Sequence, residues 1–286
     1  MSPLSPASAQ AIARLRAYVP PPTLYQTLPT SRRAAVLLLL FADRRGDLRV
    51  VLTVRSAMLK TFAGHVAFPG GKADSPHETP AQTARREAFE EIGLPLEPLP
   101  HSFTIEHLAE LPLSLAATNL GVRPCVALLN SPTGGNYEPL VPRLDPNEVQ
   151  SVFAVPLERF LRVRYGADGE RVDPESVDGV PWYTGSWVPW NGSKWKMNEF
   201  QAPVWSSSSL TRHRVWGMTA RILIDAARIA YGRDPEFSFV DRVGDEDMIK
   251  ILLDKGEMGK EKDRAESSMI YNKAQLARVK KREENL

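Results

Sequence analysis

The distribution of apolar residues along the chain predicts a series of buried strands. Residues 34–42, AAVLLLLFA, and residues 49–56, RVVLTVRS, are apolar or β-branched runs on either side of the glycine-containing turn DRRGDL. This arrangement predicts a strand, a turn and a second strand. Three further strands are predicted at HVAFPGG (65–71), which breaks at its Pro-Gly-Gly, at GVRPCVALL (121–129) and at VQSVFAVPL (149–157).

Three segments have the signals of helices. Thr79 followed by Pro80 is typical of an N-cap and a first helical residue, and Gly93 predicts that this helix ends at Ile92. LERFLRVRYG (157–166) predicts a short helix. HRVWGMTARILIDAARIAYG (213–232) predicts a long amphipathic helix whose apolar stripe comprises Trp216, Ala220, Leu223, Ala227 and Ala230.

The N-terminal segment has two interpretations. The first 42 residues contain no acidic residue but four arginines, a composition that resembles a transit peptide. Residues 8–19 also fit a short amphipathic helix with Ala11, Ile12, Leu15 and Val19 on one side. We favour the helix, docked on the domain. The C-terminal sequence ENL shares only its last residue with the Ser-Lys-Leu peroxisomal signal.

Strands that alternate with helices predict the α/β class, with one domain at residues 30–232. Residues 1–29 would be an N-terminal helix and linker. Residues 233–286 are charge-rich and predict a C-terminal extension with a short helix and a charged helical tail.

A tryptophan-rich insert is predicted within the domain at residues 162–214. Residues 180–205 hold five of the six tryptophans, and Gly185 and Asn191-Gly192 predict turns between strand segments. Two interpretations stay open: ordinary strand packing, or a ligand-facing flap or dimer contact.

The overall charge excludes some classes of partner. With 36 Lys and Arg against 34 Asp and Glu, the net charge is +2, which predicts neither nucleic acid nor an anionic membrane as a partner. No apolar run reaches the roughly 18 residues of a membrane span. The single cysteine, Cys125, excludes an internal disulfide framework and indicates a reducing, intracellular compartment; we expect it to be buried in its strand.

The predicted helix at residues 80–92 carries the candidate chemistry. Glu87 and Glu91 are four residues apart and project together, and Glu90 lies one turn beyond Glu87. Like charges at this spacing repel by a few tenths of a kcal/mol per pair, so they need a bound cation or full solvation. Oxygen ligands of this kind suit Mg²⁺ or Mn²⁺ and not zinc. The alternative is a solvated acidic face.

Two neighbouring features fit a ligand site. Arg86 can pair with Glu90 along the helix or reach back to Glu78. Gly70 and Gly71 form a predicted loop that lets the backbone approach a ligand closely.

This stretch resembles the Nudix box. Glu78 is followed after seven residues by Arg86-Glu87, then by Ala88-Phe89, by the Glu90-Glu91 pair and by Ile92-Gly93-Leu94. Residues 52–74, LTVRSAMLKTFAGHVAFPGGKAD, are similar to the signature of the coenzyme A diphosphatase branch, which also tolerates the six-residue spacer between Gly71 and Glu78. VFAVPL, VWGMTARIL and GDEDMI are further similarities to the fungal peroxisomal members. Lys60 and Phe62 differ from the Arg and His that many members carry.

The resemblance implies a Nudix-type α/β/α sandwich around a mixed β-sheet, with the N-terminal helix and C-terminal helical extension added. It implies hydrolysis of the diphosphate of coenzyme A or acyl-CoA, a small-molecule nucleotide substrate, to 3′,5′-ADP and phosphopantetheine. The catalytic residues it implies are Glu78, Arg86, Glu87, Glu90 and Glu91, and the ligands of Mg²⁺ or Mn²⁺ are Glu87, Glu90, Glu91 and the Gly71 carbonyl. Arg86 would orient Glu78 and Glu87. The substrate contacts proposed on this basis are Arg55, Lys60, Lys72 and Gly70.

Several alternatives stay open at this point. The general base is not identified; Glu148 in DPNEVQ is a candidate, and its alternative is an exposed turn residue. The same box would also serve a hydrolase of 8-oxo-dGTP, ADP-ribose or NADH, because loops set the substrate. A non-catalytic sensor or scaffold is expected to have lost a box carboxylate, and all four glutamates remain. The resemblance favours a peroxisomal location, with mitochondrion and cytoplasm as alternatives, and the protein would be a monomer or a homodimer.

Overall fold

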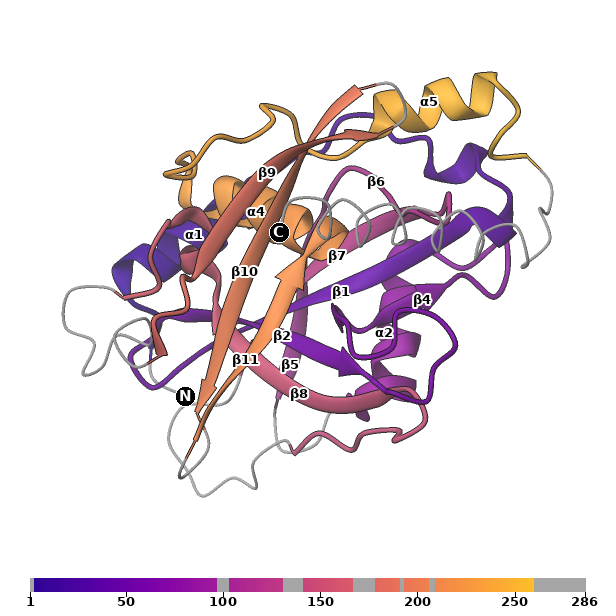
Figure 1. The fold of residues 1–286 in the computed structure, drawn as a ribbon. Helices are drawn as coiled ribbons and strands as arrows, with labels where there is room; N and C mark the ends of the chain where they lie inside the picture. Colours follow the sequence, from indigo (N-terminus) through magenta and orange to yellow (C-terminus); the bar gives the residue numbers. More distant parts are fainter. Residues whose placement is uncertain are drawn as a thin grey trace.

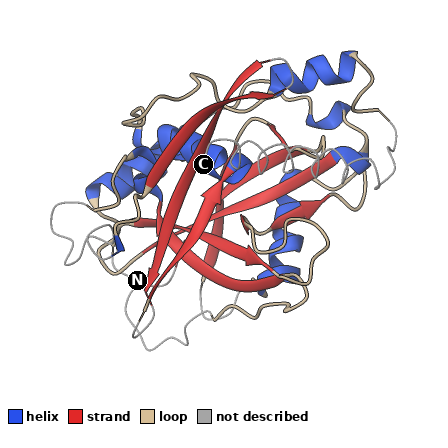
Figure 2. Cartoon of the chain, in the orientation of Figure 1, coloured by secondary structure: helices blue, strands red, loops and turns tan. Residues whose placement is uncertain are grey.

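The computed structural model describes residues 3–96, 103–130, 141–166, 178–190, 193–205 and 209–259. Within them the chain forms a mixed β-sheet with helices on both faces and a second, three-stranded sheet (Figure 1). Figure 2 shows the strands at the centre and the helices around them. The predicted α/β sandwich is confirmed. The predicted tail beyond residue 259 and the predicted turn at Asn191-Gly192 lie outside the described residues.

β1 (Arg33–Ala42) is the central strand of the main sheet and is mostly buried on both faces, as its continuous apolar run predicted. It pairs in parallel with β7 (Gly121–Asn130) and antiparallel with β2 (Leu48–Arg55). The other strands flank these three, with β3 and β8 on β2, β4 on β1, and β5 and β6 on β7. Their bounds are β3 Val66–Ala67, β4 Gly70–Lys72, β5 Thr104–Glu110, β6 Ser114–Leu115 and β8 Val149–Pro156.

Helices cover both faces of this sheet because successive side chains of β1 point to opposite sides. Leu37 and Leu39 share one core cluster with α2. Leu38 and Leu40 share the other with α1 and α4. The α-helices are α1 Pro6–Ala17, α2 Pro80–Ile92, α4 Gly217–Tyr231 and α5 Glu246–Asp254, and the 3-10 helices are η1 Tyr25–Thr27, η2 Thr30–Arg32 and η4 Leu157–Leu161.

The N-terminal helix docks on the domain as predicted. Ala11, Ile12 and Leu15 of α1 are buried in the core that α4 also lines. Val19 was wrongly included in this apolar side: α1 ends at Ala17, the chain becomes extended at Tyr18, and Val19 is 85% exposed.

The tryptophan-rich segment forms the second sheet, an antiparallel array of β9 (Tyr183–Trp190), β10 (Ser193–Trp205) and β11 (Leu210–Trp216) that crosses in front of α4 (Figure 1). Trp195 of β10 is buried, which confirms strand packing for this residue, and Trp182, just before β9, is buried in the main core. The turn predicted at Gly185 is wrong, because Gly185 lies within β9 opposite Asn198. A Cβ there would lie 2.2 Å from the Tyr183 hydroxyl, so close packing explains this glycine.

The structure corrects three further elements. The helix predicted from residue 213 begins at Gly217, because residues 213–216 pair with β10 and Gly217 has a left-handed φ of 63°. The helix predicted at residues 157–166 is limited to the 3-10 helix η4. β5 was not predicted: it is an edge strand of the main sheet whose sequence, TIEHLAE, carries charged and polar residues.

The acidic motif GDEDMI anchors the C-terminal helix. Asp245 accepts a hydrogen bond from the Leu115 backbone N–H at 2.7 Å and pairs with Arg221, although burial raises the pKa of its carboxyl. Glu246 accepts hydrogen bonds from the backbone N–H groups of Leu113 and Leu24. These contacts hold α5, β6 and the N-terminal linker together. Among the described residues, no helix combines the length and the apolar character that crossing a membrane requires.

Candidate active site

α2 is positioned by its own ends and by its narrow apolar stripe. The Thr79 side chain accepts a hydrogen bond from the Gln82 N–H, and the Gln82 side chain accepts one from the Thr79 N–H, so both donors are satisfied. Gly93 ends the helix with a φ of 67°, as predicted. Ala84 and Ala88 are fully buried against β1. Because these residues are small, α2 lies close to the sheet, and Glu87 and Glu91 lie against β4.

Arg86 connects the carboxylates of this region. Its guanidinium donates to Glu78 at 2.8 Å, to Glu87 at 3.0 Å and to Glu90 at 3.2 Å, and to the Lys72 carbonyl at 2.9 Å. The hydrogen bond from Arg86 lowers the pKa of Glu78. Both partners considered from the sequence, Glu78 and Glu90, are therefore engaged at once. Arg86 fixes the loop before α2 to the face of the helix.

Glu91 is the most buried of the glutamates in α2, with a side chain 4% exposed. Its Oε2 accepts a hydrogen bond from the Gly70 N–H at 3.1 Å, and its Oε1 lies 3.9 Å from Nη1 of Arg55. Burial raises the pKa of Glu91 to about 8, and the negative charge of Glu87 adds to the shift. An ionised Glu91 thus needs more positive charge than the protein supplies.

Gly71 makes room for the carboxylate of Glu87. A Cβ at position 71 would lie 2.4 Å from Cδ of Glu87 and 2.5 Å from each of its oxygens. The loop predicted at residues 70–71 is wrong, because both residues belong to the short strand β4 and pair with β1. Glu87 and Glu91 consequently lie side by side against a backbone that is fixed by the sheet.

Glu148 approaches the same carboxylates from the loop before β8. Its negative charge contributes to the raised pKa of Glu91 and of Glu87, although burial is the main cause in both. The Glu148 carbonyl accepts a hydrogen bond from the Ser56 N–H at 2.8 Å, and the Asp145 N–H donates to the Glu91 carbonyl at 3.1 Å. The loop is thereby joined both to the end of β2 and to the end of α2. These docking contacts were not foreseen from the sequence.

Three further predicted site residues, Glu90, Lys60 and Lys72, have exposed side chains. Glu90 is half exposed, and its carboxylate turns to Arg86. Lys60 and Lys72 are exposed, and Lys72 contributes its backbone carbonyl to Arg86. Arg55 is the predicted cation that the structure brings to the carboxylates.

The donor set fits a divalent cation. Glu87, Glu91 and the backbone of β4 offer only oxygen ligands, and burial raises the pKa of both carboxyl groups. In the part of the chain that the structure describes, no group of three or more His, Cys, Asp or Glu side chains is placed to hold a metal ion. An open set of two carboxylates is what a magnesium-type ion accepts, because such an ion keeps waters and shares itself with substrate phosphates.

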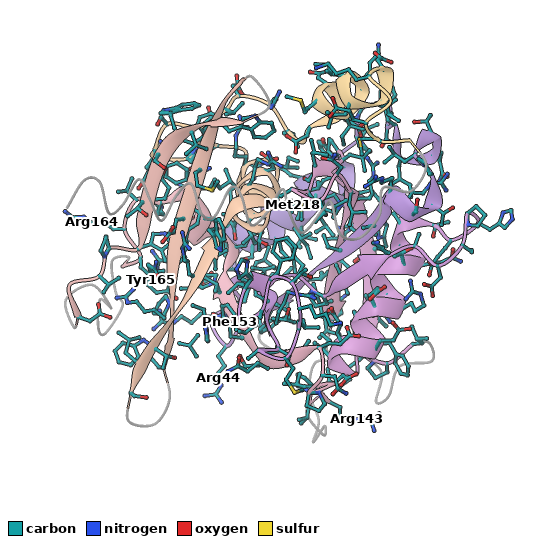
Figure 3. The ribbon with its side chains drawn as sticks, turned by 45° about the vertical axis from the view of Figure 1, so that its right-hand side comes forward. Arg44, Arg143, Phe153, Arg164, Tyr165 and Met218 are labelled. Atoms are coloured by element: carbon teal, nitrogen blue, oxygen red, sulfur yellow. The ribbon has the colours of Figure 1, made fainter. Side chains whose placement is uncertain are left out.

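The second sheet packs against the main sheet through β11. Phe153 of β8, labelled in Figure 3, lies against His213 of β11, and their ring centroids are 4.7 Å apart. Figure 3 also labels Met218 in the first turn of α4, which packs against the same core cluster as Phe153. β11 is therefore held next to the main sheet.

Comparisons with known proteins agree with this geometry. Residues 31–176 match the NUDIX domain family. The chain is 32% identical over 299 residues to peroxisomal coenzyme A diphosphatase 1 of Saccharomyces cerevisiae, across 89% of this chain and 85% of that protein. It is 35% identical over 206 residues to the mitochondrial Nudix hydrolase 15 of Arabidopsis thaliana, across 72% of this chain and 61% of that protein.

Among solved structures, an Ap4A hydrolase of C. elegans is 24% identical and covers 44% of this chain and 80% of its own, with a TM-score of 0.33. The NUDIX match at residues 31–176 contains β1, β4 and α2, with all the box glutamates in place. From the domain match and from the similarity along most of its length, the chain belongs to the Nudix hydrolase family.

Proposed function

We propose that the protein hydrolyses the diphosphate of coenzyme A or of an acyl-CoA with Mg²⁺ or Mn²⁺, releasing 3′,5′-ADP and phosphopantetheine or its acylated form. The observation that carries the proposal is the pair of carboxylates held against the glycines of β4, the buried Glu91 and the partly buried Glu87. The similarity to a coenzyme A diphosphatase over 89% of the chain supports the choice of substrate.

The residues have separate roles in this proposal. Glu87, Glu91 and the Gly71 carbonyl would hold the cation, with Glu90 at the exposed margin. The bound cation would offset charge on the phosphoryl oxygens and make water a better nucleophile. Glu78 and Arg86 hold the helix and the loop in register. Water adds to one phosphorus, and the bridging P–O bond breaks.

Two further roles complete the proposal. Glu148 is our candidate to accept the proton of the attacking water, since it acts electrostatically on both metal-binding carboxylates. Arg55 lies beside Glu91 and would contact the diphosphate, and Gly70, Lys60 and Lys72 are the further proposed substrate contacts. Arginine suits this contact because its planar guanidinium can donate two parallel hydrogen bonds to a phosphate.

A panel of substrates tests the activity. The purified chain would be incubated with CoA, acetyl-CoA, 8-oxo-dGTP, ADP-ribose and NADH in the presence of Mg²⁺ or Mn²⁺, and the products separated by chromatography. We expect 3′,5′-ADP from CoA at the highest kcat/KM of the panel. A higher kcat/KM for 8-oxo-dGTP, ADP-ribose or NADH would show that one of these compounds, and not CoA, is the preferred substrate.

Cation binding should depend on pH because Glu91 must lose its proton first. With a pKa of about 8, Glu91 is mostly protonated at pH 6 and 7. The apparent affinity for Mn²⁺ should therefore rise by about tenfold per pH unit up to about pH 8 and then level off. Calorimetric titration with Mn²⁺ at several pH values measures this slope, and Glu91→Gln is the control that should flatten it. Equal affinity of the wild type at pH 6 and pH 8 would contradict the role of Glu91.

We also propose a peroxisomal location, supported by the relative from Saccharomyces cerevisiae, whose name places it there. A mitochondrial relative makes that organelle the alternative. Imaging of the full chain with a fluorescent tag at its N-terminus, and separately at its C-terminus, distinguishes them.

A further inference from the structure

β11 carries a second arginine, Arg214, on a strand that packs against β3. The Thr219 hydroxyl in the first turn of α4 donates a hydrogen bond to the Val66 carbonyl at 3.2 Å. From Val66 the chain reaches Gly70, which donates to Glu91. The end of β11 is therefore fixed relative to the site of the carboxylates.

A continuous row of rings connects Arg55 with this turn. The Arg55 N–H donates to the His65 carbonyl at 2.9 Å. The His65 ring lies 5.3 Å from the Trp216 ring and 5.5 Å from the Phe62 ring, measured between centroids. Phe62 has a φ of 57°, a strained conformation for a bulky residue and one that is enriched at functional sites.

Arg214 stands at the end of this row. Its guanidinium lies over the Trp216 ring, 4.4 Å from the centroid, and one nitrogen pairs with Glu199 at 2.5 Å. The side chain is nevertheless 52% exposed. Stacking and one ion pair thus fix the plane of the guanidinium while part of it faces solvent, which suits recognition of a phosphate by two parallel N–H donors.

The positive charges of Arg214 and Arg55 both affect the pKa of the same imidazole, that of His65. Burial lowers the pKa of His65, and the positive charges of Arg214 and Arg55 lower it further. The two guanidinium groups therefore lie within electrostatic range of His65, one next to the metal-binding carboxylates and one farther along the row of rings. Two separate cationic groups suit a substrate that has two separate phosphate groups.

We propose that Arg214, held by Trp216 and Glu199, binds a second phosphate of the substrate, separate from the diphosphate that is cleaved. The class of substrate is a nucleoside diphosphate derivative with an additional phosphate on its ribose. The inference rests on the proposed function, because CoA carries a ribose 3′-phosphate and dephospho-CoA does not. Arg214 is thus a specificity-determining residue, contributed by a strand outside the Nudix box.

The test compares hydrolysis of CoA and dephospho-CoA by the wild type and by Arg214→Gln. We expect the ratio of kcat/KM for CoA to that for dephospho-CoA to fall by about tenfold or more in the variant, mainly through KM, because a charge-assisted pair with the phosphate is lost. Arg16→Gln is the matched control. Arg16 is also about half exposed and also pairs with one glutamate, Glu106, but it lies on α1. Its substitution should leave the ratio as in the wild type.

An unchanged ratio in Arg214→Gln overturns the inference, and so does an equal fall in the Arg16→Gln control. If the wild type hydrolyses neither compound, the proposed function fails, and binding decides the inference separately. Calorimetry then compares the binding of adenosine 3′,5′-bisphosphate with the binding of AMP. The inference is supported if the wild type binds the bisphosphate more tightly than AMP and the Arg214→Gln variant does not. Equal affinity of the wild type for both nucleotides contradicts it.

Discussion

Replacement of Glu91 by Gln should abolish most hydrolysis while the protein stays folded. Glu91 is buried and lies beside Glu87 at the glycines of β4. Solvent therefore cannot compensate for the loss of its charge. A lost metal contact is worth several kcal/mol of transition-state stabilisation, so we expect kcat/KM to fall by about 10³-fold. Steady-state kinetics at saturating Mg²⁺ measures this loss.

Glu90→Gln is the matched control for this substitution. Glu90 is adjacent in sequence and has the same chemistry, but its side chain is 51% exposed and pairs with Arg86. We expect a much smaller loss of kcat/KM in Glu90→Gln than in Glu91→Gln. Equal losses in both variants would show that the net charge of the helix, and not the buried ligand, supports activity.

The stability of Glu91→Gln separates loss of activity from loss of the fold. Between its unfolded pKa near 4.5 and its folded pKa of about 8, Glu91 holds a proton in the folded protein that the unfolded chain releases. The free energy of unfolding therefore decreases as pH rises through this window. Gln does not titrate, so at pH 8 the metal-free variant should be at least as stable as the wild type in thermal melts.

Gly71→Ala should inactivate the protein by adding a single methyl group. The new Cβ would lie within 2.5 Å of the Glu87 carboxylate, so this carboxylate must move. The displaced group is the end of a flexible side chain, and the thermal midpoint should change little. Activity should fall by about 10²-fold, the cost of a displacement near 1 Å in a reacting site.

Two measurements check this second substitution. Mn²⁺ titration should show weaker binding in Gly71→Ala, and melting curves should overlap those of the wild type. Wild-type activity together with a normal fold would contradict the placement of Glu87. A large drop in the thermal midpoint would instead indicate that β4 itself had shifted.

Local sequence signals determined most individual elements. The bounds of α2 followed from Thr79, Pro80 and Gly93, because capping and left-handed termination depend on neighbouring residues alone. The long apolar runs at β1 and β7 were equally clear, because strands buried on both faces need continuous apolar sequence. β5 was missed because its partner β7 determines its conformation more strongly than its own mixed sequence does.

The boundary at Trp216 shows where local signals fail. The apolar stripe from residue 216 onwards fits a helix, and only the pairing of Trp216 with Glu199 places the residue in a strand. The glycine that follows, Gly217, permits the change of direction. A strand partner 17 residues away in the chain is invisible to helical periodicity.

The chain by itself determined the chemical groups of the candidate site: carboxylates on one helix, an arginine between them and glycines where the backbone must come close. The tertiary structure decided which of these groups act together. It buried Glu91, left Glu90 half exposed, brought Glu148 and Arg55 to the same carboxylates and placed Arg214 beyond them. The physical reason is that burial and charge interaction depend on distances between segments remote in sequence, whereas capping, turns and apolar periodicity depend on neighbours.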